Sequence, residues 1–386
     1  MLYFWMGWEA WLACRNVFLT LEPCVDDPGW KDWFIPPVTA PAAPPYARCV
    51  HLTEGIPEPQ VHIPNKRLAF AQDAQSRDLV LKVVNTDSDE YMAYDRLLQS
   101  LDYVDAATCV GILRPTAILH TPHNFCFIVM PRWGPVGGMR GLATVGEIAQ
   151  FMRCTSKGLS FLHQHRIVHR DLCENNMVVN CYCPEVVYYR HLRPVLAQHR
   201  RSKDVHYCLI DFNISLCPPM DVSLTSYRHP SDEAWWGASL YHPQDVQRGE
   251  PEYNPFAYDV GSLGNLYRFW FWKAVPSVPL LAPLFDRMTT HILRERFTAS
   301  EAAVFIDTIF SQLSDSVLET PVVLDPNPSC FRDSDTYWSL TPAHFIAEWA
   351  LFRTPRGSWG AVLLDWFAST HLGWRMLEFV RRVLRI

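Results

Sequence analysis

The sequence lacks a basic excess and lacks paired cysteines. Its 386 residues carry 34 Lys and Arg against 40 Asp and Glu, which gives a formal net charge of −6. A general nucleic-acid binder needs a basic face to displace counterions, so we expect no nucleic-acid partner. The 12 cysteines show no Cys-x2-Cys spacing, which disfavours a zinc-binding module. We interpret them as reduced thiols of a cytoplasmic or nuclear protein.

Long uninterrupted apolar segments are also missing. The N-terminal MLYFWMGW lacks a basic n-region, and Glu9 and Arg15 interrupt the sequence that follows it. It therefore fits neither a signal peptide nor a spanning helix of ~20 residues. We expect this segment to pack on a folded domain, with a targeting role as the alternative.

The C-terminal residues 374–386 have the spacing of an amphipathic helix. Trp374, Leu377, Val380 and Leu384 fall on one stripe, with most of the arginines elsewhere. We expect the helix to dock on the protein with its arginines outward. Contact with an anionic membrane surface is the alternative.

Apolar residues and prolines are abundant. The apolar fraction of 49% excludes a disordered chain, and the 30 prolines indicate many irregular connections. Several prolines gather in IPPVTAPAAPPY, a composition that favours extended conformations over helix. We therefore interpret residues 1–50 as an N-terminal extension and expect a folded region to begin near His51.

Apolar periodicity then predicts strands followed by helices. RLAFAQDA and DLVLKVVN flank Gln75-Ser76-Arg77 and predict a β-hairpin. Residues 85–101 predict a helix capped by Asp87 or Ser88, FCFIVM predicts a buried strand, and residues 147–165 predict a longer helix. This order favours an α+β fold over a doubly wound sheet.

The stretch after the long helix carries the most specific motif. His169, Arg170, Asp171, Leu172 and Asn176 stand in the order H-R-D-L-x-x-x-N, and Asp211-Phe212 follow as the first two residues of D-F-G. Upstream, Lys82 lies in an apolar predicted strand. Downstream lie DVGSLG, which is Asp259 to Gly264, and RERFTASEA, which contains Arg296. In this order, over roughly residues 80–310, the chain resembles the protein kinase superfamily. More narrowly, it resembles the divergent protein-kinase-like proteins of mushroom-forming fungi.

The resemblance implies a bilobal fold and an activity. The expected parts are a β-rich N-lobe and hinge at 51–134, a helical C-lobe at 135–315, a long insert at about 180–206, and a C-terminal extension at 316–386. The implied activity is an ATP- and Mg²⁺-dependent protein kinase that transfers the γ-phosphate to a hydroxyl group of a protein substrate. The sequence does not identify the acceptor residue.

The resemblance also implies a role for each site residue. Lys82 would hold the α and β phosphates, with Glu90 as its carboxylate partner. Asp171 would accept the proton of the substrate hydroxyl, next to Arg170. Asn176 and Asp211 would bind magnesium through oxygen.

Two of these assignments have structural alternatives. Asp87-x-x-Glu90 also fits a capping box at a helix start. FIVMPRWG resembles the hinge, with Met130 as gatekeeper and Pro131 and Trp133 offering backbone groups to adenine. An ordinary core strand and turn is the other interpretation of that segment.

Several departures from the kinase pattern concern nucleotide binding and substrate choice. No glycine lies between Gly55 and Gly111, so HIPNKRL, residues 62–68, takes the place of a glycine-rich loop. We expect this to weaken nucleotide binding. Asn213 replaces the glycine of D-F-G, Cys173 replaces a lysine common in serine/threonine kinases, and Gln244 replaces the glutamate that pairs with Arg296 in the family.

The basic insert and the activation segment leave further alternatives. The insert is either a solvated surface loop or a docking element. Arg170 either grips a phosphate on Ser223, Thr225 or Ser226 of the activation segment or holds that segment through backbone carbonyls. For the whole chain, a pseudokinase scaffold and a small-molecule phosphotransferase are the alternatives to a protein kinase.

Overall fold

The computed structural model describes residues 2–24, 31–38, 43–51, 66–100, 110–184, 189–202, 204–235, 240–247, 249–355, 359–368 and 370–384. The fold mixes helices and strands, 46% helical and 17% strand, and includes a curled five-stranded sheet. The chain divides into two compact units, each made of two segments. Unit A comprises Met1–Gly141 and Met177–Phe212, and unit B comprises Leu142–Asn176 and Asn213–Ile386.

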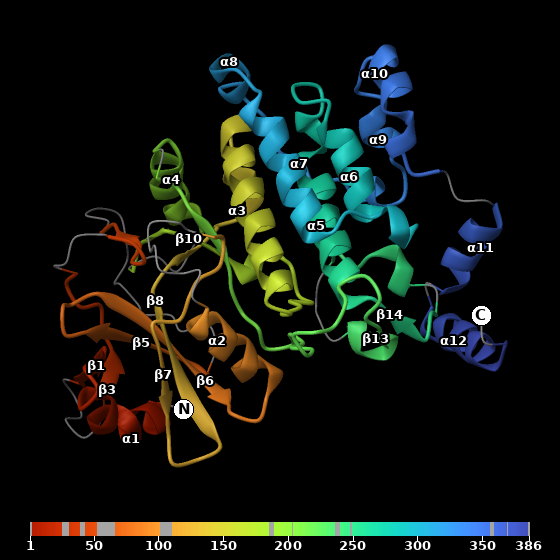
Figure 1. Cartoon of the computed structure of the whole chain (residues 1–386). Helices are drawn as coiled ribbons and strands as arrows, with labels where there is room; N and C mark the ends of the chain where they lie inside the picture. Colours follow the sequence, from red (N-terminus) through yellow and green to blue (C-terminus); the bar gives the residue numbers. More distant parts are fainter. Residues whose placement is uncertain are drawn as a thin grey trace. The chain divides into compact units, whose positions relative to one another are not determined.

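Unit A contains the five-stranded antiparallel sheet, in the order β1-β5-β6-β8-β7 (Figure 1). These strands are Val17–Leu19, Leu68–Asp73, Asp78–Asn85, Phe125–Pro131 and Ala117–His120. β5 and β6 form the predicted hairpin, and β8 is the predicted buried strand beside β6. The β-branched and aromatic residues of β6 and β8 suit a pleated, buried surface.

The helix α1 (Leu2–Ala13) packs on one face of this sheet. Its Trp5 and Leu12 are buried in a cluster of apolar sheet residues that includes Leu81. Because side chains alternate along a strand, Lys82 lies on the opposite face. The apolar N-terminal segment thus packs on the unit, as predicted.

The start of the folded region differs from the expectation. β1 pairs with β5, with Val17 opposite Asp73, so the folded part of unit A begins well before His51. The described prolines of the proline-rich segment, at 36–37 and 44–45, therefore lie within the unit and not at its boundary. A strand of three residues has too short an alternation to be recognised in sequence.

The helix α2 (Asp89–Gln99) lies against β6. Its N-cap is Ser88, whose hydroxyl accepts the N–H of Tyr91 at 3.2 Å. Of the two predicted caps, Ser88 is therefore the one used. Ala93, Tyr94 and Leu97 form the buried stripe.

Shorter strands complete unit A. β9, β10 and β12 form a three-stranded sheet, β4 pairs with β11, and β2 pairs with β3. Their bounds are Gly134–Pro135, Met177–Val179, Tyr207–Leu209, Arg48–Cys49, Cys181–Tyr182, Leu21–Pro23 and Lys31–Trp33. A 3-10 turn, η2 (Met139–Gly141), follows β9.

The insert at about 180–206 contains a helix, α4 (Tyr189–Arg200), and not only a solvated loop. Leu192, Val195 and Leu196 are buried at spacings of three and four. The buried Arg200 donates from Nη2 to the carbonyl of Val136 at 2.7 Å. The many basic residues of the insert hid this apolar stripe in the sequence.

Unit B is mostly helical (Figure 1). Its main helices are α3 (Val145–Gln164), α5 (Pro255–Phe271), α6 (Leu281–Thr289) and α7 (Ala299–Ser311). α3 is the predicted long helix, capped by Thr144. α5 is buried along nearly its whole length, as expected of a helix that is apolar on all sides. Smaller elements are β13 (His229–Pro230), β14 (Glu252–Tyr253), α8 (Asp315–Leu318), α9 (Asp335–Trp338) and α10 (Ala343–Glu348).

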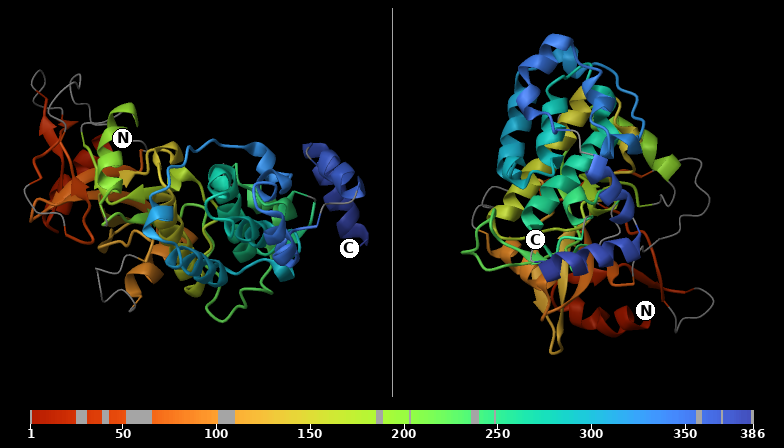
Figure 2. Two further views of the ribbon diagram at one scale, coloured as in Figure 1. Left: turned by 90° about the horizontal axis from the view of Figure 1, so that it is seen from above. Right: turned by 90° about the vertical axis from the view of Figure 1, so that its right-hand side faces the viewer.

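The C-terminal helices α11 (Trp359–Ala368) and α12 (His371–Leu384) lie side by side (Figure 2). α12 is the predicted amphipathic helix. Its buried Trp374 donates to the carbonyl of Val246 at 3.1 Å. Gly249, at φ +73°, lets the helix approach closely, since a Cβ there would meet the backbone N of Glu378 at 2.7 Å.

Much of the apolar surface of α12 is exposed, including Val380 and Leu384 of the stripe that was expected to dock. Met376, Phe379, Val380 and Val383 are 45–68% exposed. The helix therefore docks through Trp374, and contact with a membrane surface stays a prediction. Within the described residues, no helix is long and apolar enough to cross a bilayer.

Candidate active site

Unit A holds a buried charge cluster centred on Lys82 of β6. Lys82 is 5% exposed, forms an ion pair with Glu90 of α2, and donates to Asp211 Oδ1 at 2.6 Å. Burial by itself would lower the pKa of Lys82, but Tyr94 and the carboxylates of Glu90 and Asp211 outweigh it and raise that pKa above its ordinary value. A buried ammonium costs several kcal/mol to desolvate unless it is paired, so the two carboxylates explain why the lysine is tolerated there.

The position of Glu90 decides between its two predicted roles. The helix cap is Ser88, and the buried carboxylate of Glu90 reaches Lys82. The capping-box alternative is therefore wrong for Asp87 and Glu90. Lys82 and Glu90 lie within salt-bridge reach, as the sequence predicted.

Asp211 follows β12 and has an unusual backbone conformation. Its φ is +70°, a left-handed value that costs about 1–3 kcal/mol for a residue with a Cβ. The next residue, Phe212, is fully buried, with its ring edge-to-face on Tyr94 at 5.2 Å. Packing of Phe212 against α2 thus fixes the backbone that directs Asp211 toward Lys82.

Unit B holds the HRD loop, defined here as residues 169–176. The loop follows α3 and is anchored by Asp259 of α5, which is fully buried. Asp259 accepts the backbone N–H of His169 at 2.7 Å and that of Arg170 at 2.8 Å, and His163 Nε2 lies 3.1 Å away. These contacts fix the backbone immediately before Asp171.

Arg170 is held by both a carbonyl and a carboxylate. Its φ is +66°, and its Nε donates to the carbonyl of Ile214 at 2.6 Å. Its Nη1 lies 3.3 Å from Glu233 Oε2, and His229 Nε2 lies 2.8 Å from the same oxygen. Burial alone would raise the pKa of Glu233, but the hydrogen bond and charge of His229, together with Arg170, lower it.

These contacts bear on the predicted activation switch. The contact with the carbonyl of Ile214, three residues after Asp211, agrees with the alternative in which Arg170 holds the activation segment through a backbone carbonyl. Glu233 supplies an anion that the sequence interpretation did not include. Ser223, Thr225 and Ser226 are exposed, and a phosphate on any of them stays a prediction.

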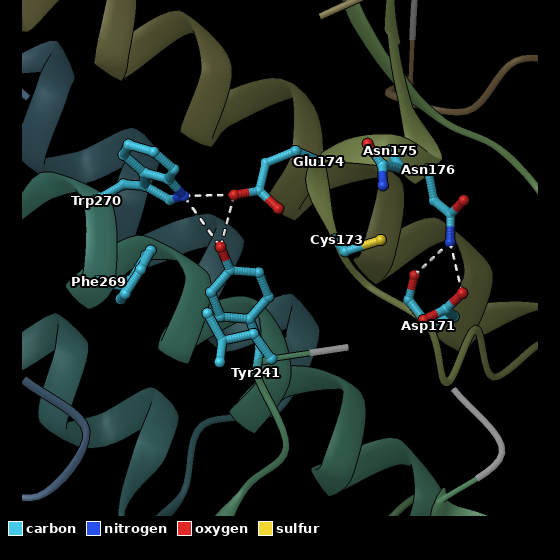
Figure 3. Close-up of a pocket in the computed structure, with 9 residues that line it drawn as sticks. Asp171, Cys173, Glu174, Asn175, Asn176, Tyr241, Phe269 and Trp270 are labelled. Atoms are coloured by element: carbon cyan, nitrogen blue, oxygen red, sulfur yellow. Dashed lines mark hydrogen bonds between the residues drawn. The ribbon is translucent and has the colours of Figure 1, made fainter. Parts of the chain in front are cut away.

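Asp171 and Asn176 lie together within the HRD loop (Figure 3). Asn176 Nδ2 donates to both the carbonyl and Oδ2 of Asp171, at 2.8 Å each. Asp171 Oδ1 is buried, with no hydrogen-bond partner in the described part of the chain. An unsatisfied buried carboxylate oxygen costs about 1–3 kcal/mol, which a bound donor would remove.

The expected hinge residues lie at and just after the end of β8. Met130 is opposite Val80 of β6, so it shares the sheet face of Lys82. Pro131 is the last residue of β8. The indole of Trp133 donates to the carbonyl of Pro45 at 2.8 Å, so its side chain is fixed by the N-terminal segment. An adenine-binding role for their backbone groups stays a prediction.

Two further expectations concern residues outside this cluster. Of the segment expected to replace a glycine-rich loop, residues 62–65 lie outside the described residues. Arg296 donates to the carbonyls of Thr290 and Ala257, at 2.6–3.0 Å. Gln244 donates instead to the carbonyl of Phe331 at 3.3 Å, in keeping with its lack of charge.

Sequence reasoning missed three positioning residues. Asp259 was part of a matched motif but had no assigned role, and His163 and Glu233 were not singled out. Buried backbone N–H groups, such as those of His169 and Arg170, need a hydrogen-bond acceptor. The signal in the sequence was Asp259, a charged residue in an otherwise apolar helix. Nothing in the local sequence marked Glu233.

The magnesium site predicted from the sequence has few protein ligands. No group of three or more His, Cys, Asp or Glu side chains in the described ranges is arranged to hold a metal ion. Magnesium takes one or two protein carboxylates and completes its octahedron with water and phosphate oxygens, so a magnesium site needs fewer protein ligands than such a group, and the roles of Asp211 and Asn176 stay predictions. The Asp211 side chain is 33% exposed, which leaves its carboxylate accessible to a metal ion.

The structure therefore brings Lys82, Glu90 and Asp211 together in unit A. It brings Arg170, Asp171 and Asn176 together in unit B. Compared with models of known protein families and with curated protein sequences, the chain matches none of them.

Proposed function

We propose that this chain is an ATP- and magnesium-dependent protein kinase with a bilobal kinase-like fold. The observation that carries the proposal is the buried Lys82 held between Glu90 and Asp211, a residue 129 positions later in the chain. A lysine fixed by carboxylates on one sheet face is suited to bind phosphate oxygens. The HRD loop anchored by Asp259 supports the same proposal. Unit A contains the N-lobe of the proposal, residues 51–134, but also residues 177–212, which the sequence assigned to the C-lobe; unit B contains most of the proposed C-lobe.

Each residue has a role in the proposed transfer. Lys82 binds the α and β phosphates, and Glu90 keeps its ammonium in place. Asp211 and Asn176 supply oxygen ligands to magnesium, which neutralises charge that develops on the phosphates. In the chain, Asn176 directly precedes β10 and Asp211 follows β12 by two residues, and β10 is paired with β12.

The reaction itself requires one proton acceptor. The acceptor oxygen attacks the γ-phosphorus, the bond from that phosphorus to the ADP oxygen breaks, and the hydroxyl proton passes to the Asp171 carboxylate. The contacts from Asn176 leave Oδ1 of Asp171 for this task. Arg170 and Asp259 position the loop and do not touch the reacting atoms.

Magnesium-dependent ATP binding tests the proposal. Calorimetry on the full chain should show ATP binding that requires Mg²⁺, and radiolabelled ATP should give labelled protein acceptor. Asp211→Asn should lose the magnesium dependence, whereas Asp307→Asn, an exposed change of the same kind in unit B, should retain it. Absence of magnesium-dependent ATP binding in the wild type would contradict the proposal.

A pseudokinase scaffold is the second candidate, and a specific observation favours it. The absence of glycine between Gly55 and Gly111 removes the close backbone approach that phosphates usually receive. Asn213 after Asp211-Phe212 is a further departure. Nucleotide binding without phosphate transfer to any acceptor would select this candidate.

A further inference from the structure

A cavity of about 440 Å³ lies in unit B beside Asp171 (Figure 3). We call it the Glu174 cavity. Its volume is within the range of about 300–1,000 Å³ that small ligands occupy. The lining includes two carboxylates, Asp171 and Glu174, and three aromatic side chains, Tyr241, Phe269 and Trp270, but no Lys, Arg or His.

Hydrogen bonds fix the Glu174 carboxylate in this cavity. Its Oε1 accepts the hydroxyl of Tyr241 at 2.6 Å and the indole N–H of Trp270 at 2.5 Å. Burial and the charge of Glu174 both raise the pKa of Tyr241, so this phenol keeps its proton and donates it. Within the described residues, Glu174 Oε2 has no hydrogen-bond partner.

A second acceptor at the same cavity also lacks a donor. Asp171 Oδ1 is buried and unpartnered among the described residues, while Oδ2 receives the amide of Asn176. The cavity therefore offers Glu174 Oε2 to a donor of the ligand, beside the Asp171 Oδ1 that takes the proton of the acceptor hydroxyl in the proposed transfer. Two carboxylates without a neighbouring cation repel an anion and attract a cation.

We propose that the Glu174 cavity binds a cationic group carried by the phosphate acceptor. A guanidinium or ammonium would pair with Glu174 through a charge-assisted hydrogen bond. The faces of Tyr241 and Trp270 would add cation–π attraction. The inference rests on the proposed function, because it assigns the substrate class of that same site.

Two sources could supply this cation beside the acceptor hydroxyl. One is an arginine or lysine next to the phosphorylated residue of a protein, which we favour because the proposed substrate is a protein. The other is a small amino alcohol. Serine peptides with one arginine at successive flanking positions, and ethanolamine as an alternative acceptor, distinguish the two.

Peptides that carry citrulline, the neutral isostere of arginine, in place of the arginine are the matched controls in the transfer assays. Wild type should phosphorylate the best arginine peptide with a kcat/KM about tenfold above that of its citrulline counterpart, as loss of a charged hydrogen bond predicts. Glu174→Gln should remove this ratio, whereas Glu319→Gln, an exposed change of the same kind in unit B, should retain it. An equal kcat/KM for both peptides in the wild type would overturn the inference while leaving the kinase proposal standing.

Direct binding keeps the test independent of turnover. In calorimetry on the full chain, acetyl-arginine amide should bind about tenfold more tightly than acetyl-citrulline amide, and Glu174→Gln should remove the difference. Trp270→Phe, which keeps an aromatic ring but loses the N–H donor, serves as a second variant if Glu174→Gln unfolds, and it should reduce the difference. Equal binding of the two amides, or no binding of either, overturns the inference. Arginine-selective binding in a chain that shows no magnesium-dependent ATP binding would retain the cavity assignment and reject the kinase.

Discussion

Replacing Asp259 by alanine tests whether this buried carboxylate holds the HRD loop. The change removes the acceptor of two backbone N–H groups, those of His169 and Arg170, and the partner of His163. Each buried donor left without an acceptor costs about 1–3 kcal/mol, and breaking a buried charged cluster costs about 3–5 kcal/mol. We therefore expect the free energy of unfolding to fall by about 3–5 kcal/mol. Phosphate transfer should fall as well, because the backbone before Asp171 is no longer fixed.

Urea unfolding followed by circular dichroism measures this loss, with Asp307→Ala in α7 as the control. Asp307 is likewise a carboxylate with several partners, the cations Arg153 at 3.2 Å and Lys157 at 2.8 Å, but its side chain is 41% exposed. Exposed ion pairs contribute about 1 kcal/mol or less. If Asp259→Ala is too unstable to purify, Asp259→Asn keeps one acceptor oxygen and should show a smaller loss. A loss for Asp259→Ala no larger than that for Asp307→Ala would refute the reasoning.

Three further predictions concern other parts of the chain. Asp211→Asn should abolish phosphate transfer from radiolabelled ATP while the circular dichroism spectrum stays unchanged; equal turnover rejects Asp211 as a metal ligand. In the folded state the pKa of Glu233 lies below its ordinary 4.5. The ionised carboxylate therefore stabilises the fold above pH 4.5, and this stabilisation is lost as the pH falls through the folded-state pKa. The Glu233→Gln variant should therefore have a lower free energy of unfolding than wild type at neutral pH and an equal one in acid. Urea unfolding at a series of pH values measures this, and a difference between the two proteins that does not change with pH would contradict it. If α12 contacts membranes, the chain should sediment with vesicles of anionic lipid; Phe379→Ser should weaken this and Leu351→Ser should not.

Local signals in the sequence predicted most elements that carry the site. The alternation in DLVLKVVN and the turn before it were enough for the β5–β6 hairpin, because neighbouring strands need only a short connection. The three- and four-residue spacing of apolar side chains predicted α3 and α12 in the same way. The α4 helix was missed because its short stripe is interrupted by Pro194 and surrounded by basic residues.

By itself, the sequence determined the identity and order of Lys82, Asp171, Asn176 and Asp211, since their motif depends on spacing along the chain. It left open whether Glu90 caps a helix or pairs with a lysine, and only the packing of α2 on β6 decided for the ion pair.

The partners that only the tertiary structure revealed lie far away in the chain. Glu233 reaches Arg170 across 63 residues, and Tyr241 reaches Glu174 across 67. Such pairs form only when many other contacts have offset the entropy of closing a long loop, so no local pattern encodes them. The Glu174 cavity has the same origin: its aromatic wall comes from residues 241–270 and its carboxylates from the HRD loop, and their meeting depends on how α5 packs against that loop.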